Sequence, residues 1–236
     1  GTANEVTALP AGWTFLETDT NADTQYAAGT GSSNAGNTYS FGVAGSDERA
    51  FGGLLSGSLV PSMGAGFINN TGAIITSIQI SYWGEQWRLG ALNRGADRLD
   101  FQYSINAASL NSGTWTDVDA LDFLSPQTTG STGARNGNDP QNRMMLNYTI
   151  AGLSIENGAL FYLRWQDFNV GNADDGLAID DFTLIPSGIP LTQPSITFTP
   201  ASLDFGEVNI NTTNITTYQV KGANLDEAIQ ITADSA

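Results

Sequence analysis

Short alternating segments recur along this chain, and they constrain its fold more than any other feature. The clearest occupies 98–105, where Leu99, Phe101, Tyr103 and Ile105 alternate with polar residues. Successive side chains of a β-strand point to opposite faces, so this pattern predicts a half-buried strand. No stretch keeps a helical period over three turns, so we predict an all-β fold, a two-sheet jelly-roll β-sandwich. Strands are expected over 13–17, 38–43, 58–69, 73–83, 98–105, 114–119, 144–151, 159–168 and 177–185.

Composition argues against several classes of function. The net charge of −16 argues against nucleic acid as a direct ligand and suits divalent cations as partners. No run is long and apolar enough for membrane insertion. The chain has no His and no Cys, so the usual nucleophile–base sets are absent. Carboxylate pairs can hydrolyse glycosides, but none of Glu48, Glu85 and Glu156 has a diagnostic setting. We therefore expect no enzymatic activity.

A proline-rich segment divides the chain. Residues 186–194 hold three Pro and a Gly, which is typical of a stiff linker. We predict a sandwich module over 1–187, a linker over 188–194 and a partial immunoglobulin-like β-domain over 195–236, with strands at 195–200, 203–208, 214–220 and 229–232. An immunoglobulin-like sandwich needs roughly 100 residues, so this second domain is incomplete, or is completed from outside the chain. An unfinished sandwich exposes a strand edge, where self-association is possible.

Two acidic pairs bracket the last strand of the larger domain, at 174–175 and 180–181. Strict alternation places Asp180 with Phe182, and Asp181 with Ile179. Whichever face is the core, one carboxylate leans toward apolar neighbours, and a buried charge is costly unless it is paired or metal-bound. An ion pair of Asp180 or Asp181 with Arg164 or Arg88 is one solution, and a metal ion is the other.

Two oxygen-rich loops are candidate calcium sites. Asp19, Asn21 and Asp23 alternate as at the start of an EF-hand loop, but Thr24 and Thr30 stand where that motif has Gly and Glu. A jelly-roll calcium site with carbonyls and a distant Asp remains open, as does an ordinary polar loop. The second loop covers 169–175, where Asn and Asp are also common turn residues. The predicted metal ligands are Asp19, Asn21, Asp23, Asp174, Asp175 and Asp181.

An aromatic segment is the candidate ligand patch. Trp83, Trp87 and Arg88 flank an expected turn at 84–86, which carries Glu85. Aromatic faces stack on sugar rings, and Glu and Arg hydrogen-bond hydroxyl groups. The segment therefore indicates a glycan-binding patch formed by Trp83, Glu85, Trp87 and Arg88, with core and rim packing of the Trp rings as the alternative.

Several separated motifs carry a resemblance to a known type of module. They are ERAFGGL at 48–54, IQISYWGEQWRL at 78–89, LDFQYS at 99–104, GTWTDV at 113–118, LRW at 163–165 and DDGLAIDDF at 174–182. Together, over about residues 10–186, they resemble a non-catalytic β-sandwich module of secreted multidomain bacterial proteins, which often accompanies extracellular nucleases or lamin-tail domains. The ending is similar to the MAM type of jelly roll. Residues 198–208 resemble the opening of immunoglobulin-like repeats of bacterial surface proteins.

The resemblance implies an extracellular or cell-surface setting and a binding or spacer role without catalytic residues. Our main hypothesis is a calcium-stabilised binding or adhesion module that recognises a glycan or another extracellular polymer. One alternative is a structural spacer or filament subunit whose tail domain is completed by a neighbouring chain. Another is an accessory domain of a secreted nuclease, with catalysis encoded outside this chain.

Overall fold

The computed structural model describes residues 3–5, 9–190, 194–199, 207, 209–213, 215–223, 225 and 227–232. The chain divides into two compact units, Gly1–Ile189 and Pro190–Ala236. No helix among the described residues is long or apolar enough to cross a membrane.

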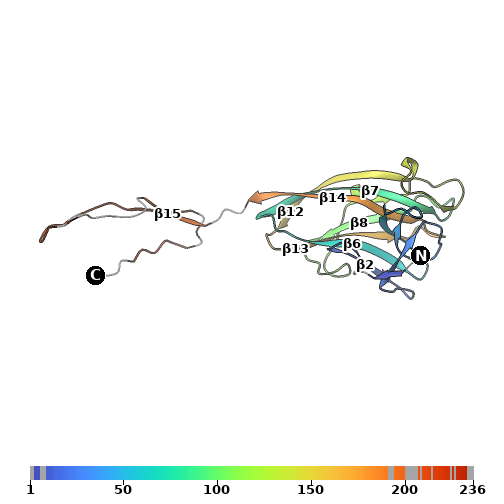
Figure 1. Cartoon of the computed structure of the whole chain (residues 1–236), viewed down its shortest axis with the longest axis horizontal. Helices are drawn as coiled ribbons and strands as arrows, with labels where there is room; N and C mark the ends of the chain where they lie inside the picture. Colours follow the sequence, from blue (N-terminus) through green and yellow to red (C-terminus); the bar gives the residue numbers. More distant parts are fainter. Residues whose placement is uncertain are drawn as a thin grey trace. The chain divides into compact units, whose positions relative to one another are not determined.

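The first unit is a sandwich of two sheets, which confirms the predicted all-β class (Figure 1). In Figure 1 the first sheet, with β7 and β14, lies above the second, with β6 and β2. Every strand pairing whose direction is resolved is antiparallel except β3 with β4, which is parallel. In sheet order, the first sheet contains β1 (Ala3–Glu5), β3 (Gln25–Gly29), β4 (Asn37–Phe41), β5 (Ala50–Leu54), β14 (Gly176–Pro190), β7 (Ala73–Leu89) and β11 (Gly133–Ala134), and β12 (Arg143–Ile155) also pairs with β7.

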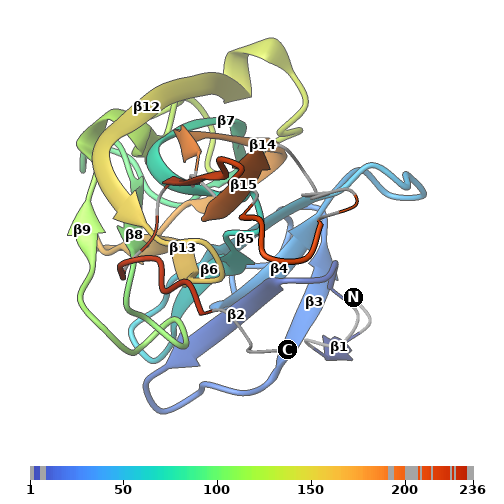
Figure 2. The same cartoon turned by 90° about the vertical axis from the view of Figure 1, so that its left-hand side faces the viewer.

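The second sheet completes the sandwich. Its strands are, in order, β10 (Phe123–Leu124), β8 (Arg98–Ser104), β13 (Leu160–Phe168), β6 (Val60–Ile68) and β2 (Trp13–Thr18), and β9 (Thr116–Asp117) pairs with β8. Two single turns of 3-10 helix, η2 (Asp119–Leu121) and η3 (Pro140–Asn142), lie in the connections. In the end-on view, β12 curves along the outside of the unit and β7, its pairing partner, lies on the inner side of that curve (Figure 2).

The main core lies between the two sheets and is centred on Trp165. Its ring makes edge contacts with Tyr82, Phe101 and Phe182 at centroid distances of 5.3, 5.1 and 5.6 Å. Leu99 and Phe101 are fully buried, as their alternation predicts. Ile105 differs from that prediction, because β8 ends at Ser104 and Ile105 is 49% exposed.

A second apolar cluster lies on the outer face of the first sheet. Ala178 belongs to it, whereas its neighbours Leu177 and Ile179 belong to the main core, so the two clusters occupy opposite faces of β14. The loop before β12 covers this cluster, since a Cβ on Gly137 would lie 2.3 Å from the Trp87 indole. The members of the outer cluster are Tyr39, Phe41, Ala50, Leu54, Trp87 and Ala178.

The expected turn at 84–86 is wrong, because β7 runs without interruption from Ala73 to Leu89. The reason for Gly84 is packing. A Cβ at this position would lie 2.2 Å from the Phe123 ring, which occupies that space in the main core. The glycine therefore permits a close approach between the strand and an aromatic ring and does not mark a turn.

A shift within β14 changes the faces expected for its two carboxylates. Leu177, Ile179 and Phe182 all face the main core. Because Ile179 and Phe182 are three positions apart, the alternation shifts by one residue between these two side chains. Asp181 has a φ of 49°, the left-handed backbone that accompanies a β-bulge. Asp180 therefore stays on the outer face and Asp181 is exposed, so neither carboxylate enters the main core.

The second unit contains one antiparallel pair, β15 (Ser195–Thr199) with β16 (Gln219–Ala223). The Phe198 and Tyr218 rings stack at 5.8 Å between centroids. The strand expected over 203–208 lies, apart from Glu207, outside the described residues, as do 191–193 of the expected linker and residue 214. Residues 229–232, expected as a strand, are not in one.

Candidate binding site beside β5 and β14

An open cleft of about 420 Å³ lies beside β5 and β14 in the first unit. Ligand pockets typically span about 300–1,000 Å³ and combine apolar walls with a few polar groups, and this cleft has both. β5 and β14 pair antiparallel, with Ile179 opposite Phe51, which brings together segments that are far apart in the sequence. The lining residues are Leu9, Pro10, Trp13, Tyr26, Ser40, Arg49, Ala50, Phe51, Ile179, Asp180, Asp181 and Phe182.

Trp13 is the principal aromatic side chain of the cleft. One face of its ring stacks on Trp165 of the main core, at 5.9 Å between centroids and 14° between planes. Phe51 and Phe182 meet it edge-on at 6.3 and 5.5 Å. These contacts hold the indole in place where it lines the cleft. A ligand therefore does not have to order the Trp13 side chain when it binds.

Arg49 is the cation of the cleft, and its guanidinium is also held in position. Its Nε donates to Ser40 Oγ at 3.1 Å, and its Nη2 donates to the backbone oxygens of Ser40 and Gly29. Asp180 and Asp181 line the same cleft. A ligand in the cleft therefore meets an apolar ring, a cationic donor and acidic acceptors.

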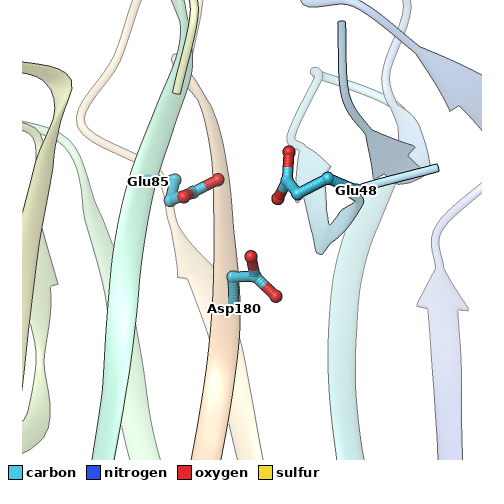
Figure 3. Close-up of side chains that lie close together, drawn as sticks. All are labelled: Glu48, Glu85 and Asp180. Carbon is cyan, nitrogen blue, oxygen red and sulfur yellow. The ribbon is translucent and has the colours of Figure 1, made fainter. Parts of the chain in front are cut away.

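Three carboxylates converge next to the cleft (Figure 3). Glu48 comes from the connection between β4 and β5, Glu85 from β7 and Asp180 from β14. One oxygen of each carboxylate lies within 4.8 Å of one oxygen of each of the others. We call this group the carboxylate cluster. Asp180 belongs both to the cluster and to the cleft, so the two features form one continuous site.

Glu85 is the buried member of the cluster. Its side chain is fully inaccessible, and its Oε2 accepts a hydrogen bond from Trp87 Nε1 at 2.9 Å. Its Oε1 has no hydrogen-bond partner among the described residues, and the guanidinium of Arg143 is 4.0 Å away. Burial raises the pKa of Glu85 to about 7, against the lowering effect of the Trp87 bond, and the charges of Asp180 and Glu48 raise it further.

The pKa of Asp180 is also raised. Burial, followed by a hydrogen-bonded contact with Glu48, raises it to about 6. The hydrogen bond that Asp180 Oδ1 accepts from the Asp181 amide at 2.8 Å acts in the opposite direction. Glu48 also accepts a hydrogen bond from Asn138 Nδ2. The cluster therefore holds more negative charge than its neighbours balance, and it favours a proton or a cation.

The raised pKa values predict that stability without divalent cations falls as pH rises. The folded-state pKa values of Glu85 and Asp180 exceed their ordinary values of 4.5 and 3.8, so the folded state binds protons more tightly than the unfolded state. Their stabilising effect is complete below pH about 4 and is lost as pH rises through about 6 to 7. Urea denaturation in chelator across this window measures it. Glu85→Gln is expected to flatten the profile, and stability that rises with pH contradicts the interpretation.

A second cluster of three aspartates lies next to an arginine that balances part of its charge. Asp100, Asp117 and Asp122 also bring carboxylate oxygens within 4.8 Å of one another. Arg98 Nε lies 2.6 Å from Asp100 and 3.6 Å from Asp122, so an internal cation offsets part of this charge. The carboxylate cluster at Glu85 has no ion pair of comparable length among the described residues, with Arg143 as its nearest cation.

The loop predicted to bind calcium after β2 is held by hydrogen bonds within the loop and to Ser58. Asn21 Nδ2 donates to Ser58 Oγ at 2.8 Å, and the Gln25 amide donates to Asp23 Oδ1 at 2.7 Å. Asp19 has a φ of 75°, as turn residues often do. Asp19, Asn21 and Asp23 are exposed, and they lie in a different segment from the carboxylate cluster.

Asp174 and Asp175 belong to a buried ion-pair network around Arg94, which the sequence analysis missed. Arg94 lies 3.1 Å from Asp97, 3.6 Å from Asp174 and 2.7 Å from Asp175. Asp175 also accepts hydrogen bonds from the Gly90 amide at 2.7 Å, Gln86 Nε2 at 2.8 Å and Ser125 Oγ at 2.6 Å. The carboxylate of Asp175 is therefore fully used in joining these segments.

The ion pairs expected for Asp180 and Asp181 do not form. Arg164 donates to Gln102 Oε1 and to the Leu110 carbonyl, and Arg88 donates to the carbonyls of Gly31 and Ser32. Both guanidiniums instead tie loops to the sandwich. Asp180 lies with two other carboxylates, and Asp181 is exposed.

The structure does not bring the predicted glycan patch together on one surface. Trp87 is 1% exposed and stacks on Phe41 at 6.0 Å, so its ring face is covered. Glu85 is buried in the carboxylate cluster, and Arg88, at the next position after Trp87, points to the other face of β7. Trp83 is partly exposed, with the Arg143 guanidinium 4.4 Å above its ring.

The cleft residues were missed although part of the signal was in the sequence. Arg49 and Phe51 lie in the ERAFGGL motif, and Asp180 and Phe182 lie in the DDGLAIDDF motif. The pairing of β5 with β14 is what places these two motifs side by side. Trp13 precedes both by many residues and carries no motif that links it to them.

No protein-family model and no curated protein matches this sequence. Among solved structures, the chain is similar to the K1 cleaved adhesin domain of Lys-gingipain from Porphyromonas gingivalis W83, with 11% identity, 79% of this chain and 98% of that chain covered, and a TM-score of 0.43. It is also similar to TmCBM61 in complex with β-1,4-galactotriose, with 16% identity, 78% of this chain and 91% of that chain covered, and a TM-score of 0.35. A third similar structure is the enzymatically active domain of tailspike protein 4 of bacteriophage CBA120, with 8% identity, 75% of this chain and 20% of that chain covered, and a TM-score of 0.39.

Proposed function

We propose that the first unit is a non-catalytic binding module of an extracellular or cell-surface protein, and that its cleft holds a saccharide segment of an extracellular glycan. The observation that carries this proposal is Trp13, an indole fixed by Trp165 that lines a cleft beside Arg49 and Asp181. The apolar C–H face of a sugar ring packs on such an indole, while its hydroxyl groups donate to carboxylates and accept from a guanidinium.

The rigidity of the cleft supports binding of a flexible polymer. A glycan loses conformational freedom when it binds, so a site that is already ordered keeps more of the interaction energy. The Trp13 ring packs against Trp165, Phe51 and Phe182, and Arg49 is held by three hydrogen bonds. Only the ligand then has to be ordered.

A binding role without hydrolysis agrees with the position of the carboxylates. Glycoside hydrolysis needs one carboxyl group to protonate the glycosidic oxygen and a second to act on the opposite side of the sugar. Glu85 has a fully inaccessible side chain, so it does not reach a glycosidic oxygen of a ligand in the cleft. The two carboxylates that line the cleft, Asp180 and Asp181, are neighbours on β14 and are therefore not positioned to flank a bound sugar from opposite sides. We therefore propose that the site retains its glycan unchanged.

A glycan array tests the proposal, with Trp13→Phe and Asp181→Ala as the cleft variants. We expect the wild-type chain to bind a subset of the glycans, and each cleft variant to weaken that binding by about tenfold or more, because each loses a contact worth about 1–2 kcal/mol. Trp83→Ala is the matched control, since Trp83 is partly exposed and lies outside the cleft. Thermal melting confirms that each variant is folded.

Two outcomes would overturn the proposal. One is that the wild-type chain binds no glycan on the array. The other is that Trp83→Ala abolishes binding while both cleft variants bind normally, which would move the ligand to the β7 segment.

A further inference from the structure

We infer that Glu48, Glu85 and Asp180 form a Ca²⁺ site at the edge of the cleft. One oxygen of each lies within 4.8 Å of the others. Ca²⁺ binds oxygen ligands at about 2.3–2.6 Å, so two ligands of one ion lie up to about 5 Å apart. The three carboxylates are therefore spaced as ligands of a single ion, and in Figure 3 they surround a common space.

An independent observation points to a ligand in this space. Glu85 is fully buried, yet its Oε1 has no hydrogen-bond partner among the described residues. A buried acceptor without a partner is costly, and a buried carboxylate oxygen is more so. Arg143 does not supply the missing partner, because its Nη1 is 4.0 Å away and its guanidinium lies over the Trp83 ring. A cation coordinated by Glu85 removes this cost.

The donor set selects a hard cation. All three ligands are carboxylates, and the chain has no His or Cys to favour zinc or another softer metal. Mg²⁺ requires near-ideal octahedral geometry at about 2.0–2.1 Å, which suits a rigid site. Glu48 is exposed and lies in a connection between strands, so the cluster is adaptable on one side and suits the larger, irregular coordination of Ca²⁺. Water completes the coordination on that side.

The ion site also connects to the cleft through Asp180, which lines both. A bound ion holds Asp180 and neutralises acidic charge at the cleft wall. The inference does not depend on the proposed function, however, since the cluster and its unpaired oxygen are present whether or not the cleft binds a glycan. Calorimetry with CaCl₂ alone therefore tests the ion site separately from the saccharide.

The experiment titrates CaCl₂ into the full chain after removal of divalent cations, near pH 7.5, which lies above the pKa of about 6 for Asp180 and of about 7 for Glu85. We expect saturable binding, and a rise in melting temperature with Ca²⁺, because a ligand that binds only the folded state stabilises it. Glu85→Gln and Asp180→Asn are expected to weaken the binding by about tenfold or more, since each replaces a charged ligand by a neutral one. Both are close in shape to the wild-type residue, and melting in chelator verifies that they fold.

Two control variants distinguish Ca²⁺ binding at the carboxylate cluster from binding to acidic residues elsewhere on the surface. Asp47→Asn removes an exposed charge next to Glu48 that is not in the cluster, and Asp23→Asn alters the loop after β2. Both are expected to bind Ca²⁺ with wild-type affinity at the cluster and to keep the full thermal shift. MgCl₂ is titrated in parallel and is expected to bind at least about tenfold more weakly.

Three results would overturn the inference. The wild-type chain fails to bind at millimolar Ca²⁺, the Glu85→Gln and Asp180→Asn variants bind as tightly as the wild type, or Mg²⁺ binds as tightly as Ca²⁺. If Asp23→Asn alone abolishes binding, the ion belongs to the loop after β2 and the cluster is not its site.

Discussion

Replacing Arg94 by methionine is expected to lower the free energy of unfolding by about 3–5 kcal/mol. The Arg94 side chain is 3% exposed and lies within 3.6 Å of carboxylate oxygens of Asp97, Asp174 and Asp175. Removing the cation that pairs with these three buried carboxylates leaves them without that counter-charge, which costs more than the ion pairs themselves contribute. Urea denaturation near neutral pH measures the loss.

The matched control for this variant is Arg135→Met. Arg135 is partly exposed and donates only to the nearby Ser131 and Ala134 carbonyls, so its replacement is expected to change stability by no more than about 0.5 kcal/mol. The deficit of Arg94→Met is expected to shrink at acidic pH, because protonation removes the unbalanced charge. A deficit below about 1 kcal/mol at neutral pH would contradict the role assigned to Arg94.

Trp165→Ala is expected to cost about 3–5 kcal/mol, as large-to-small changes of buried aromatic residues do. The ring is fully buried at the centre of the main core, where it touches Tyr82, Phe101, Phe182 and Trp13. The cavity also removes the surface on which the Trp13 indole stacks, so the variant is expected to bind glycan more weakly even where it is still folded.

Denaturation and the glycan array together check this prediction. Trp115→Ala is the control, since Trp115 is only partly buried and contacts the Arg164 guanidinium, which lies 3.9 Å from its ring centroid. We expect a smaller loss of stability and unchanged glycan binding for the control. If Trp165→Ala unfolds no more easily than Trp115→Ala, the main core is not centred where we place it.

The strand pattern was sufficient to predict the fold class, because alternation is a local property. Leu99 and Phe101 are buried as their positions in the pattern require. The failures arise where tertiary packing overrides a local signal. Gly84 reads as a turn in sequence, but it is required because Phe123 fills the space beside it. The bulge at Asp181 shifts the alternation by one residue, and nothing in the spacing of the aspartates reveals it.

The candidate site was predicted only in part because its residues come from distant segments. The sequence pattern predicts Glu85 as a sugar contact, whereas the structure buries it beside Asp180 and Glu48. Trp87 has the composition of a ligand platform but is covered by Phe41 and the loop at Gly137. Trp13 meets the paired strands β5 and β14 only because the second sheet packs against the first. That packing is not encoded in any single segment of the sequence.

The most direct test of the whole account is a crystal structure of the chain with Ca²⁺ and a glycan selected on the array. The account predicts density for a sugar ring against Trp13 in the cleft, with hydroxyl groups near Arg49 and Asp181. Density for the sugar on Trp83, or on any surface away from the cleft, would contradict it.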